Sequence, residues 1–266
     1  MLKIQALIIH FYKYQGAGND FVMIDNRTAN FVPEKSLIEK LCDRRFGIGA
    51  DGLILLESDE NSDFKMIYFN SDGRPSSMCG NGGRCIVRFG AELGIIENKT
   101  NFQAVDGEHE AIIENEIIHL KMSNVSSVQK FSNHLFLNTG SPHHIEFLSD
   151  ISDLDVQNRG REIRYGAPYF EEGSNVNFAE IISDNSLRIR TYERGVEAET
   201  LACGTGITAA AIAAYESEKI LSNEINIEAL GGKLKVRFRK NESGGYEDVW
   251  LSGPAEFVFE GRIDVE

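Results

Sequence analysis

The sequence predicts an α/β fold, rich in strands with a few helices and organised as two similar halves. Short apolar runs bounded by Gly, Asn and Asp recur along its 266 residues, a pattern typical of strands. Helix-like patterns are fewer, and turn residues between successive strand-like runs indicate antiparallel meanders. The third observation is an internal repeat, which predicts that one structural unit occurs twice.

Strands are expected where apolar residues alternate or run together, at residues 21–24, 53–56, 66–69, 111–113 and 117–120. Helices are expected at residues 34–45, from Cys79 to about 93, at 156–165 and from 204 to about 218. The run of alanines and one isoleucine at 209–214 supports the last of these. Because strands do not alternate regularly with helices, a Rossmann sheet is not expected.

The internal repeat consists of three features that recur in the same order at nearly one offset. A Cys-Gly-x-Gly turn opens a helix in each half, a strand precedes each turn, and a glycine-containing turn lies further upstream. The pairs are Cys79 and Cys203 (124 residues apart), Phe69 and Tyr192 (123), and Gly18 and Gly140 (122). With Ser, Asn and Gln clustered at 123–132, we expect an N-terminal half at 1–128 and a C-terminal half at 129–256.

Composition favours a cytoplasmic protein that acts on small molecules. A hydrophobic content of 42% is sufficient for a buried core, and a formal charge of −14 disfavours binding to nucleic acid or anionic membranes. Four cysteines are too few for a disulfide scaffold, which favours a reducing compartment. The apolar run at 6–9 is too short for a signal peptide, and no segment is typical of a membrane span.

The cysteines allow several interpretations. The spacing of Cys79 and Cys85 does not fit a zinc knuckle, and no second cysteine pair follows. Neither glycine-rich turn ends like a P-loop, and Phe21 replaces the third glycine of a dinucleotide-binding motif. Cys42 and Cys85 lie in apolar helical patterns, so we expect them to be buried.

Cys79 and Cys203 differ because each directly precedes the first turn of a predicted helix. A helix N-terminus offers unpaired N–H groups and partial positive charge, which stabilise a thiolate and can hold a carboxylate. If an approximate two-fold relates the halves, the two cysteines face each other. One thiolate and one thiol on opposite sides of a carbon atom can exchange its proton with inversion.

These residues resemble those of the diaminopimelate epimerase family, whose members interconvert LL- and meso-diaminopimelate without a cofactor. The matching segments cover nearly the whole chain, at residues 16–21, 46–52, 70–73, 79–84, 140–143, 175–176, 192–195 and 202–206. The resemblance implies an α/β (α+β) fold of two pseudo-symmetric halves, each a curved mixed, largely antiparallel sheet around a central helix. It also implies an active site in the cleft between the halves, and that residues 257–266 return to the first half.

The resemblance further implies roles for single residues. Cys203 would accept and Cys79 would donate the proton in the LL-to-meso direction, with His143 and Glu193 supporting them. Arg194 would bind a carboxylate at the non-reacting end of the substrate. The implied substrate-binding residues are Asn19, Asn70, Gly80, Asn81, Ser141, Asn175, Glu193, Arg194, Gly204 and Thr205.

The chain departs from the family pattern at three positions. Ser141 stands where many members have Asn, Gly52 where some have Gln, and Arg74 where Ser is usual. The first two affect the expected recognition of the far end of the substrate, whereas the third is expected to be a surface substitution.

No metal, pyridoxal phosphate or nucleotide is implied, and a homodimer and a place in lysine and peptidoglycan precursor synthesis are expected. Two alternatives stay open. A proline or hydroxyproline racemase uses the same pair of cysteines, although that family generally has His where this chain has Asn81. A non-catalytic amino-acid-binding protein, or a relative of the phenazine-biosynthesis isomerases, would share the fold without needing both thiols.

Overall fold

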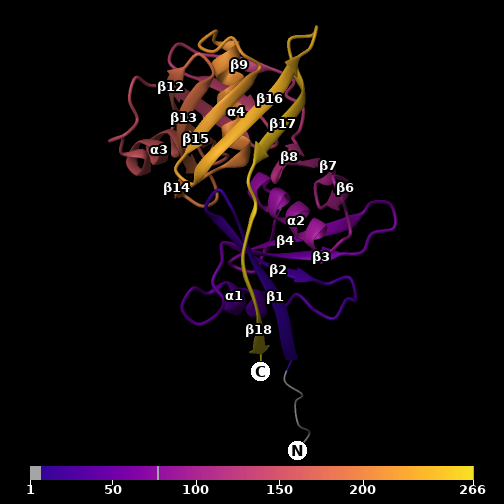
Figure 1. The fold of residues 1–266 in the computed structure, drawn as a ribbon. Helices are drawn as coiled ribbons and strands as arrows, with labels where there is room; N and C mark the ends of the chain where they lie inside the picture. Colours follow the sequence, from indigo (N-terminus) through magenta and orange to yellow (C-terminus); the bar gives the residue numbers. More distant parts are fainter. Residues whose placement is uncertain (1–6, 77, 266) are drawn as a thin grey trace, which may run out of the picture. The chain divides into compact units, whose positions relative to one another are not determined.

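The computed structural model describes residues 7–76 and 78–265, which divide into two compact units (Figure 1). The first unit comprises the chain up to Ile118 together with the segment from Pro254 onward, and the second comprises His119–Gly253. The two halves expected from the sequence, 1–128 with 257–266 and 129–256, stay a prediction.

The first unit is a mixed sheet with two helices. Its pairing order is β18–β1–β2–β3–β4–β6–β7; β2 and β3 are parallel, as are β4 and β6, and the short β5 pairs with β4. The elements are β1 (Leu7–Gly16), β2 (Asn19–Asp25), α1 (Lys35–Cys42), β3 (Gly52–Glu57), β4 (Phe64–Asn70), β5 (Pro75–Ser76), α2 (Gly80–Glu92), β6 (Lys99–Ala104), β7 (Gly107–Glu114) and β18 (Glu256–Val265).

The second unit follows the same plan. Its pairing order is β9–β10–β11–β12–β13–β15–β16–β17–β8; β11 and β12 are parallel, as are β13 and β15, and β14 pairs with β13. The elements are β8 (Ile117–Lys121), which runs in from the first unit, β9 (Val128–Lys130), β10 (Leu135–Asn138), β11 (Pro142–Phe147), α3 (Val156–Tyr165), β12 (Asn175–Ser183), β13 (Ser186–Glu193), β14 (Ala198–Thr200), α4 (Gly204–Glu216), β15 (Glu224–Ala229), β16 (Gly232–Lys240) and β17 (Tyr246–Gly253).

The two units repeat each other in both strand order and register. The β2–β3 pairing sets Phe21 opposite Gly52, and the β11–β12 pairing sets His143 opposite Asn175. In each unit one helix connects the first two parallel strands: α1 lies between β2 and β3, and α3 lies between β11 and β12. A 13-residue helix follows later in each unit, α2 after β5 and α4 after β14. The predicted α/β fold of two pseudo-symmetric halves is therefore confirmed.

The second helix of each unit, which has 13 residues, lies at the centre of its sheet. Helix α4 contacts strands on both sides of the second unit, from β10 to β17, and residues 207–214 are all buried. A helix that is apolar all round is stable only when surrounded by protein, which explains its alanine-rich sequence. In the first unit α2 packs on β1, β2 and β3 and buries Cys85, as expected.

The predicted helix at 34–45 ends earlier, at Cys42 in α1. Asp43 adopts an extended backbone, and its carboxylate accepts the N–H groups of Arg45 and Phe46, each at 2.7 Å. This side-chain capping of a turn replaces the last helical turn that the apolar pattern predicts. Cys42 is buried, as expected, and burial raises the pKa of its thiol to about 12.

No helix among the described residues is both long enough and apolar enough to span a membrane.

Helix α3 packs against the outer side of the second sheet through Gly160. A Cβ atom at this position would lie 2.4 Å from Cβ of Tyr192, which is buried. We therefore expect Gly160→Ala to lower the free energy of unfolding by about 1–3 kcal/mol, because the helix must move away from the sheet. Chemical denaturation measures this change, and Arg161→Ala, at an exposed position of the same helix, should change it by less than about 0.5 kcal/mol. Equal stability of Gly160→Ala and the parent would contradict this packing.

Candidate active site

Cys79 forms the N-cap of α2, as the sequence predicted. Its backbone is extended (φ −106°), and its Sγ accepts the N–H of Gly82 at 3.2 Å. A Cβ atom on Gly82 would lie 3.2 Å from the same sulfur and 3.1 Å from Ile54, so glycine keeps this turn tight. A sulfur that accepts a helix N–H group is well placed to carry negative charge.

Cys203 holds the same position in the second unit. It forms the N-cap of α4 with φ −107°, its Sγ lies 3.5 Å from Oγ1 of Thr205, and the residue is buried. None of the four cysteines forms a disulfide. Each unit therefore presents one thiol at the start of its central helix, beside the backbone N–H groups of the first turn.

In the first unit the structure brings Asn19 and Asn81 together. Asn81 Nδ2 lies 3.4 Å from Asn19 Oδ1, and Asn19 Nδ2 donates to Asp51 at 2.6 Å. Asn70 is exposed at the end of β4, where the strand pairing sets it opposite Gly52. Asn19, at the start of β2, thus lies beside Asn81, which stands in the first turn of α2 two residues after Cys79.

A charged network beside Asn19 was not predicted. Arg44 donates to both Asp20 and Asp51, at 2.7 and 2.8 Å, and Lys13 lies 2.7 Å from Asp20. Burial raises the pKa of Asp20, but the bonds from Arg44 and Lys13 outweigh it and lower that pKa to about 2. In the sequence, Asp20 and Asp51 indicate that a charged group could lie here. Their pairing with Arg44 and Lys13 depends on tertiary contacts.

Arg84 is a second residue that sequence analysis left without a role. Its side chain is fully buried and donates to Gly80 O at 3.0 Å, to Asn81 Oδ1 at 3.0 Å and to Pro254 O at 3.3 Å. Burial lowers the pKa of the guanidinium. Arg84 therefore ties the first turn of α2 to the chain between β17 and β18 and orients the Asn81 amide.

In the second unit Ser141, Asn175 and Arg194 form one hydrogen-bonded group. Asn175 donates to Ser141 Oγ at 2.9 Å and to Pro142 O at 3.0 Å, and its Oδ1 accepts the backbone N–H of Arg194 at 2.9 Å. The Arg194 guanidinium donates to Glu172 O at 3.0 Å. The buried Asn175 thus links the turn before β11 to the end of β13.

Glu193 ends β13 and accepts a hydrogen bond from Thr200 at 2.9 Å, three residues before Cys203. Glu193 corresponds to Asn70 of the first unit, because each is the last residue of the equivalent strand, β13 or β4. Candidate residues at corresponding positions in the two units, such as Asn19 and Ser141, therefore differ in side chain.

His143 is buried on β11 beside the first turn of α4. A Cβ atom on Gly206 would lie 3.4 Å from His143 Cε1, and Asn177 Nδ2 lies 3.1 Å from His143 Nδ1. Burial, with a smaller effect of the positive charge on Arg194, lowers the pKa of His143 to about 3. His143 is therefore neutral near pH 7.

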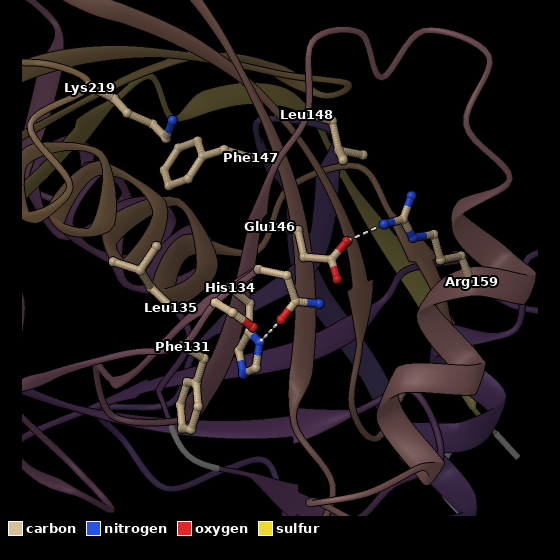
Figure 2. Close-up of a pocket in the computed structure, with 10 residues that line it drawn as sticks. Phe131, His134, Leu135, Glu146, Phe147, Leu148, Arg159 and Lys219 are labelled. Atoms are coloured by element: carbon tan, nitrogen blue, oxygen red, sulfur yellow. Dashed lines mark hydrogen bonds and ion pairs between the residues drawn. The ribbon is translucent and has the colours of Figure 1, made fainter.

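A pocket of about 420 Å³ in the second unit includes none of the predicted site residues. Figure 2 shows Glu146 facing Arg159 across it, with His134 and Phe131 on one wall and Lys219 near Phe147.

Among the described residues, no group of three or more His, Cys, Asp or Glu side chains is arranged to hold a metal ion. The polar groups at the two helix N-termini are thus the candidate binding groups.

The fold is shared with solved structures of several proteins. A PhzF-family phenazine biosynthesis protein from Bacillus anthracis has a TM-score of 0.75 at 15% identity, covering 97% of this chain and 100% of that one. A hydroxyproline epimerase from Agrobacterium vitis has a TM-score of 0.71 at 13% identity, covering 97% and 93%. At these identities the comparison establishes the fold class.

Sequence comparison identifies the family. A family model described as diaminopimelate epimerase matches residues 11–128 and 135–258. Diaminopimelate epimerases from Flavobacterium psychrophilum and Chlorobaculum tepidum are 58% and 43% identical, covering 95% and 93% of this chain and 99% and 98% of theirs. The chain belongs to the diaminopimelate epimerase family, which confirms the resemblance and the expected enzyme class, an isomerase.

Neutral His143 makes stability depend on pH in a defined window. The unfolded chain binds a proton on this side chain near pH 6.5, whereas the native state does so only near pH 3. The contribution of His143 to stability is therefore complete above pH 6.5 and is lost as the pH falls from 6.5 towards 3. We expect the free energy of unfolding to fall with a slope approaching about 1.4 kcal/mol per pH unit from this residue.

Denaturation between pH 7 and 5 measures the total slope, to which His134 also contributes because burial lowers its pKa, whereas the carboxylates titrate mainly below that range. His143→Gln should reduce this slope, and His10→Gln, at an exposed position, should not. The same slope in the parent and in His143→Gln would show that His143 is not buried in its neutral form.

Proposed function

We propose that the protein interconverts LL- and meso-diaminopimelate by a cofactor-independent exchange of the α-proton between Cys79 and Cys203. The observation that carries the proposal is that both cysteines are N-caps of equivalent central helices, one in each unit. The family assignment supports the substrate, because the relatives at 58% and 43% identity are named diaminopimelate epimerases.

The proposed reaction conserves protons and charge. One cysteine, as thiolate, removes the α-proton, and the other, as thiol, delivers a proton to the opposite face of the same carbon. The enzyme then holds the proton on the other sulfur, ready for the reverse reaction. The proposal requires the two sulfur atoms to reach opposite faces of the α-carbon, with Cys203 the acceptor in the LL-to-meso direction.

Stabilisation of the carbanion is the main energetic demand of this reaction. Removing the α-proton shifts negative charge onto the adjacent carboxylate, and N–H groups at a helix N-terminus stabilise such charge. We assign this role to the backbones of Gly80, Asn81, Gly204 and Thr205. Both central helices begin directly after a cysteine, and in the first unit the N–H of Gly82 donates to Cys79 Sγ.

Recognition of the rest of the substrate is assigned to side chains near these turns. Arg194, whose backbone N–H is bound by Asn175, is proposed to bind the non-reacting carboxylate. The remaining binding groups are Asn19, Asn70, Ser141, Asn175 and Glu193. The product would supply lysine and peptidoglycan precursor synthesis in the cytoplasm.

The proposal is tested by proton NMR in heavy water with reduced enzyme. LL-diaminopimelate and meso-diaminopimelate should lose their α-proton signals and interconvert, whereas L-proline and trans-4-hydroxy-L-proline should not. Exchange of the cyclic amino acids alone would replace the proposal with a proline or hydroxyproline racemase. No exchange with any of the four would leave a binding protein as the better interpretation.

Both thiols should be necessary. Cys79→Ala and Cys203→Ala should each reduce kcat for epimerisation by about 10²–10⁴-fold or more, since each removes one proton-transfer group. Cys42→Ala, which removes a buried thiol as Cys203→Ala does, is the matched control and should retain activity. Substantial turnover by either active-site variant would contradict the two-cysteine mechanism.

Arg194→Lys should raise KM for diaminopimelate roughly tenfold with a smaller effect on kcat, because lysine keeps the charge but loses the bidentate geometry. Steady-state kinetics test this, with Arg237→Lys at an exposed strand position as control. Unchanged KM would remove Arg194 from the binding site.

A further inference from the structure

His143 carries a buried polar atom without a hydrogen-bond partner. Within residues 7–76 and 78–265, nothing accepts from or donates to its Nε2, and the side chain has no exposed surface. An unsatisfied buried group costs about 1–3 kcal/mol, so its presence needs an explanation. The neighbouring residues show which form of the imidazole is present.

Asn177 determines the tautomer. Its Nδ2 donates to the backbone O of His144 at 3.0 Å, an atom that can only accept, and its Oδ1 accepts the hydroxyl of Thr191 at 3.0 Å. The amide orientation is therefore fixed, and the second Nδ2 hydrogen points to Nδ1 of His143 at 3.1 Å. Nδ1 must accept, so the proton of the neutral ring is on Nε2.

The first unit shows that this network is not needed to build the fold. By strand register, Phe21, Ile54 and Tyr68 of the first unit correspond to His143, Asn177 and Thr191 of the second. Phe21 and Tyr68 pack edge to face, with ring centroids 5.9 Å apart. The same framework thus accepts an apolar and aromatic cluster. The second unit instead keeps the polar residues His143, Asn177 and Thr191 at a cost in stability, which points to a functional role.

The network also lies directly against the Cys203 turn. A Cβ atom on Gly206 would lie 2.4 Å from Asn177 Oδ1 and 3.4 Å from His143 Cε1. The second glycine of the Cys-Gly-Thr-Gly turn therefore admits the Asn177 amide and the His143 ring to the first turn of α4. The Cε1 edge of the ring, which bears the neighbouring Nε2–H, lies beside this turn.

We propose that Asn177, held by Thr191, is a positioning residue that fixes His143 as the Nε2–H tautomer, so that His143 donates a hydrogen bond at the first turn of α4 and does not accept a proton there. The catalytic consequence rests on the proposed function. In the reaction, the Nε2–H finds its acceptor in negative charge that develops beside the α4 N-terminus, where it adds to the backbone N–H groups. The low pKa of His143 agrees with a ring that stays neutral.

The tautomer can be measured without any assay of activity. NMR of enzyme labelled with ¹⁵N-histidine distinguishes a protonated from an unprotonated ring nitrogen, and His143→Gln assigns the signal. We expect Nε2 protonated and Nδ1 unprotonated from pH 8 to pH 5. Asn177→Asp replaces the donor with an acceptor of the same size and should move the proton to Nδ1.

Thr191→Val provides a second test if Asn177→Asp folds poorly, and Thr191→Ser should restore the parent signal. Loss of the single Nε2–H form in Thr191→Val, with recovery in Thr191→Ser, supports the proposal. Protonated Nδ1 in the parent enzyme, or an unchanged signal in Asn177→Asp, would overturn it.

Enzyme activity distinguishes a hydrogen-bond donor from an acceptor at position 143. His143→Gln keeps an N–H group near the Nε2 position and should retain kcat within about tenfold, whereas His143→Glu, an acceptor, should lose roughly 10²–10³-fold. The reverse order would show that His143 accepts a proton. If the parent enzyme exchanges no diaminopimelate proton, the proposed function fails, but the NMR result still decides whether Asn177 fixes the tautomer.

Discussion

A helix placed at the centre of a sheet leaves the N–H groups of its first turn without partners inside the helix, where little water can reach them. In both units a cysteine N-cap followed by glycines stands at this point. Glycine lets neighbouring groups approach the turn closely, as Gly82 and Gly206 show. The anion-stabilising environment that the proposed chemistry needs is thus a consequence of how the central helices are buried.

The two units satisfy this constraint with different side chains. Below the α2 turn the buried Arg84 binds Gly80 O and Asn81, whereas at the corresponding position of α4 the hydroxyl of Thr208 bonds to Gly204 O at 3.0 Å. Conversely, the second unit carries the His143 network where the first is apolar. A duplicated framework with unlike side chains suits the proposed reaction, in which two thiols act on opposite faces of an asymmetric centre.

Fold and family are informative at different levels. The solved structures at 13–15% identity share the architecture, so the framework itself does not specify a substrate. The family is established by matches along almost the whole chain, whereas several groups proposed to recognise diaminopimelate lie at strand ends and in turns, as Asn19, Ser141 and Arg194 do. We therefore propose that specificity resides in side chains such as Asn19, Ser141 and Arg194 rather than in the sheets.

Local patterns in the sequence were sufficient to determine the four helices, the internal repeat, both cysteine N-caps and the family, because glycines, capping positions and apolar periodicity act over a few residues. These patterns did not predict that α1 ends at Cys42, because the Asp43 side chain competes with the helix for backbone N–H groups. Only the tertiary structure revealed that Arg84 is buried, that Arg44 bridges two aspartates, and that Asn177 orients His143. These contacts join residues that are distant in sequence, and their identity depends on strand register, which no single segment encodes.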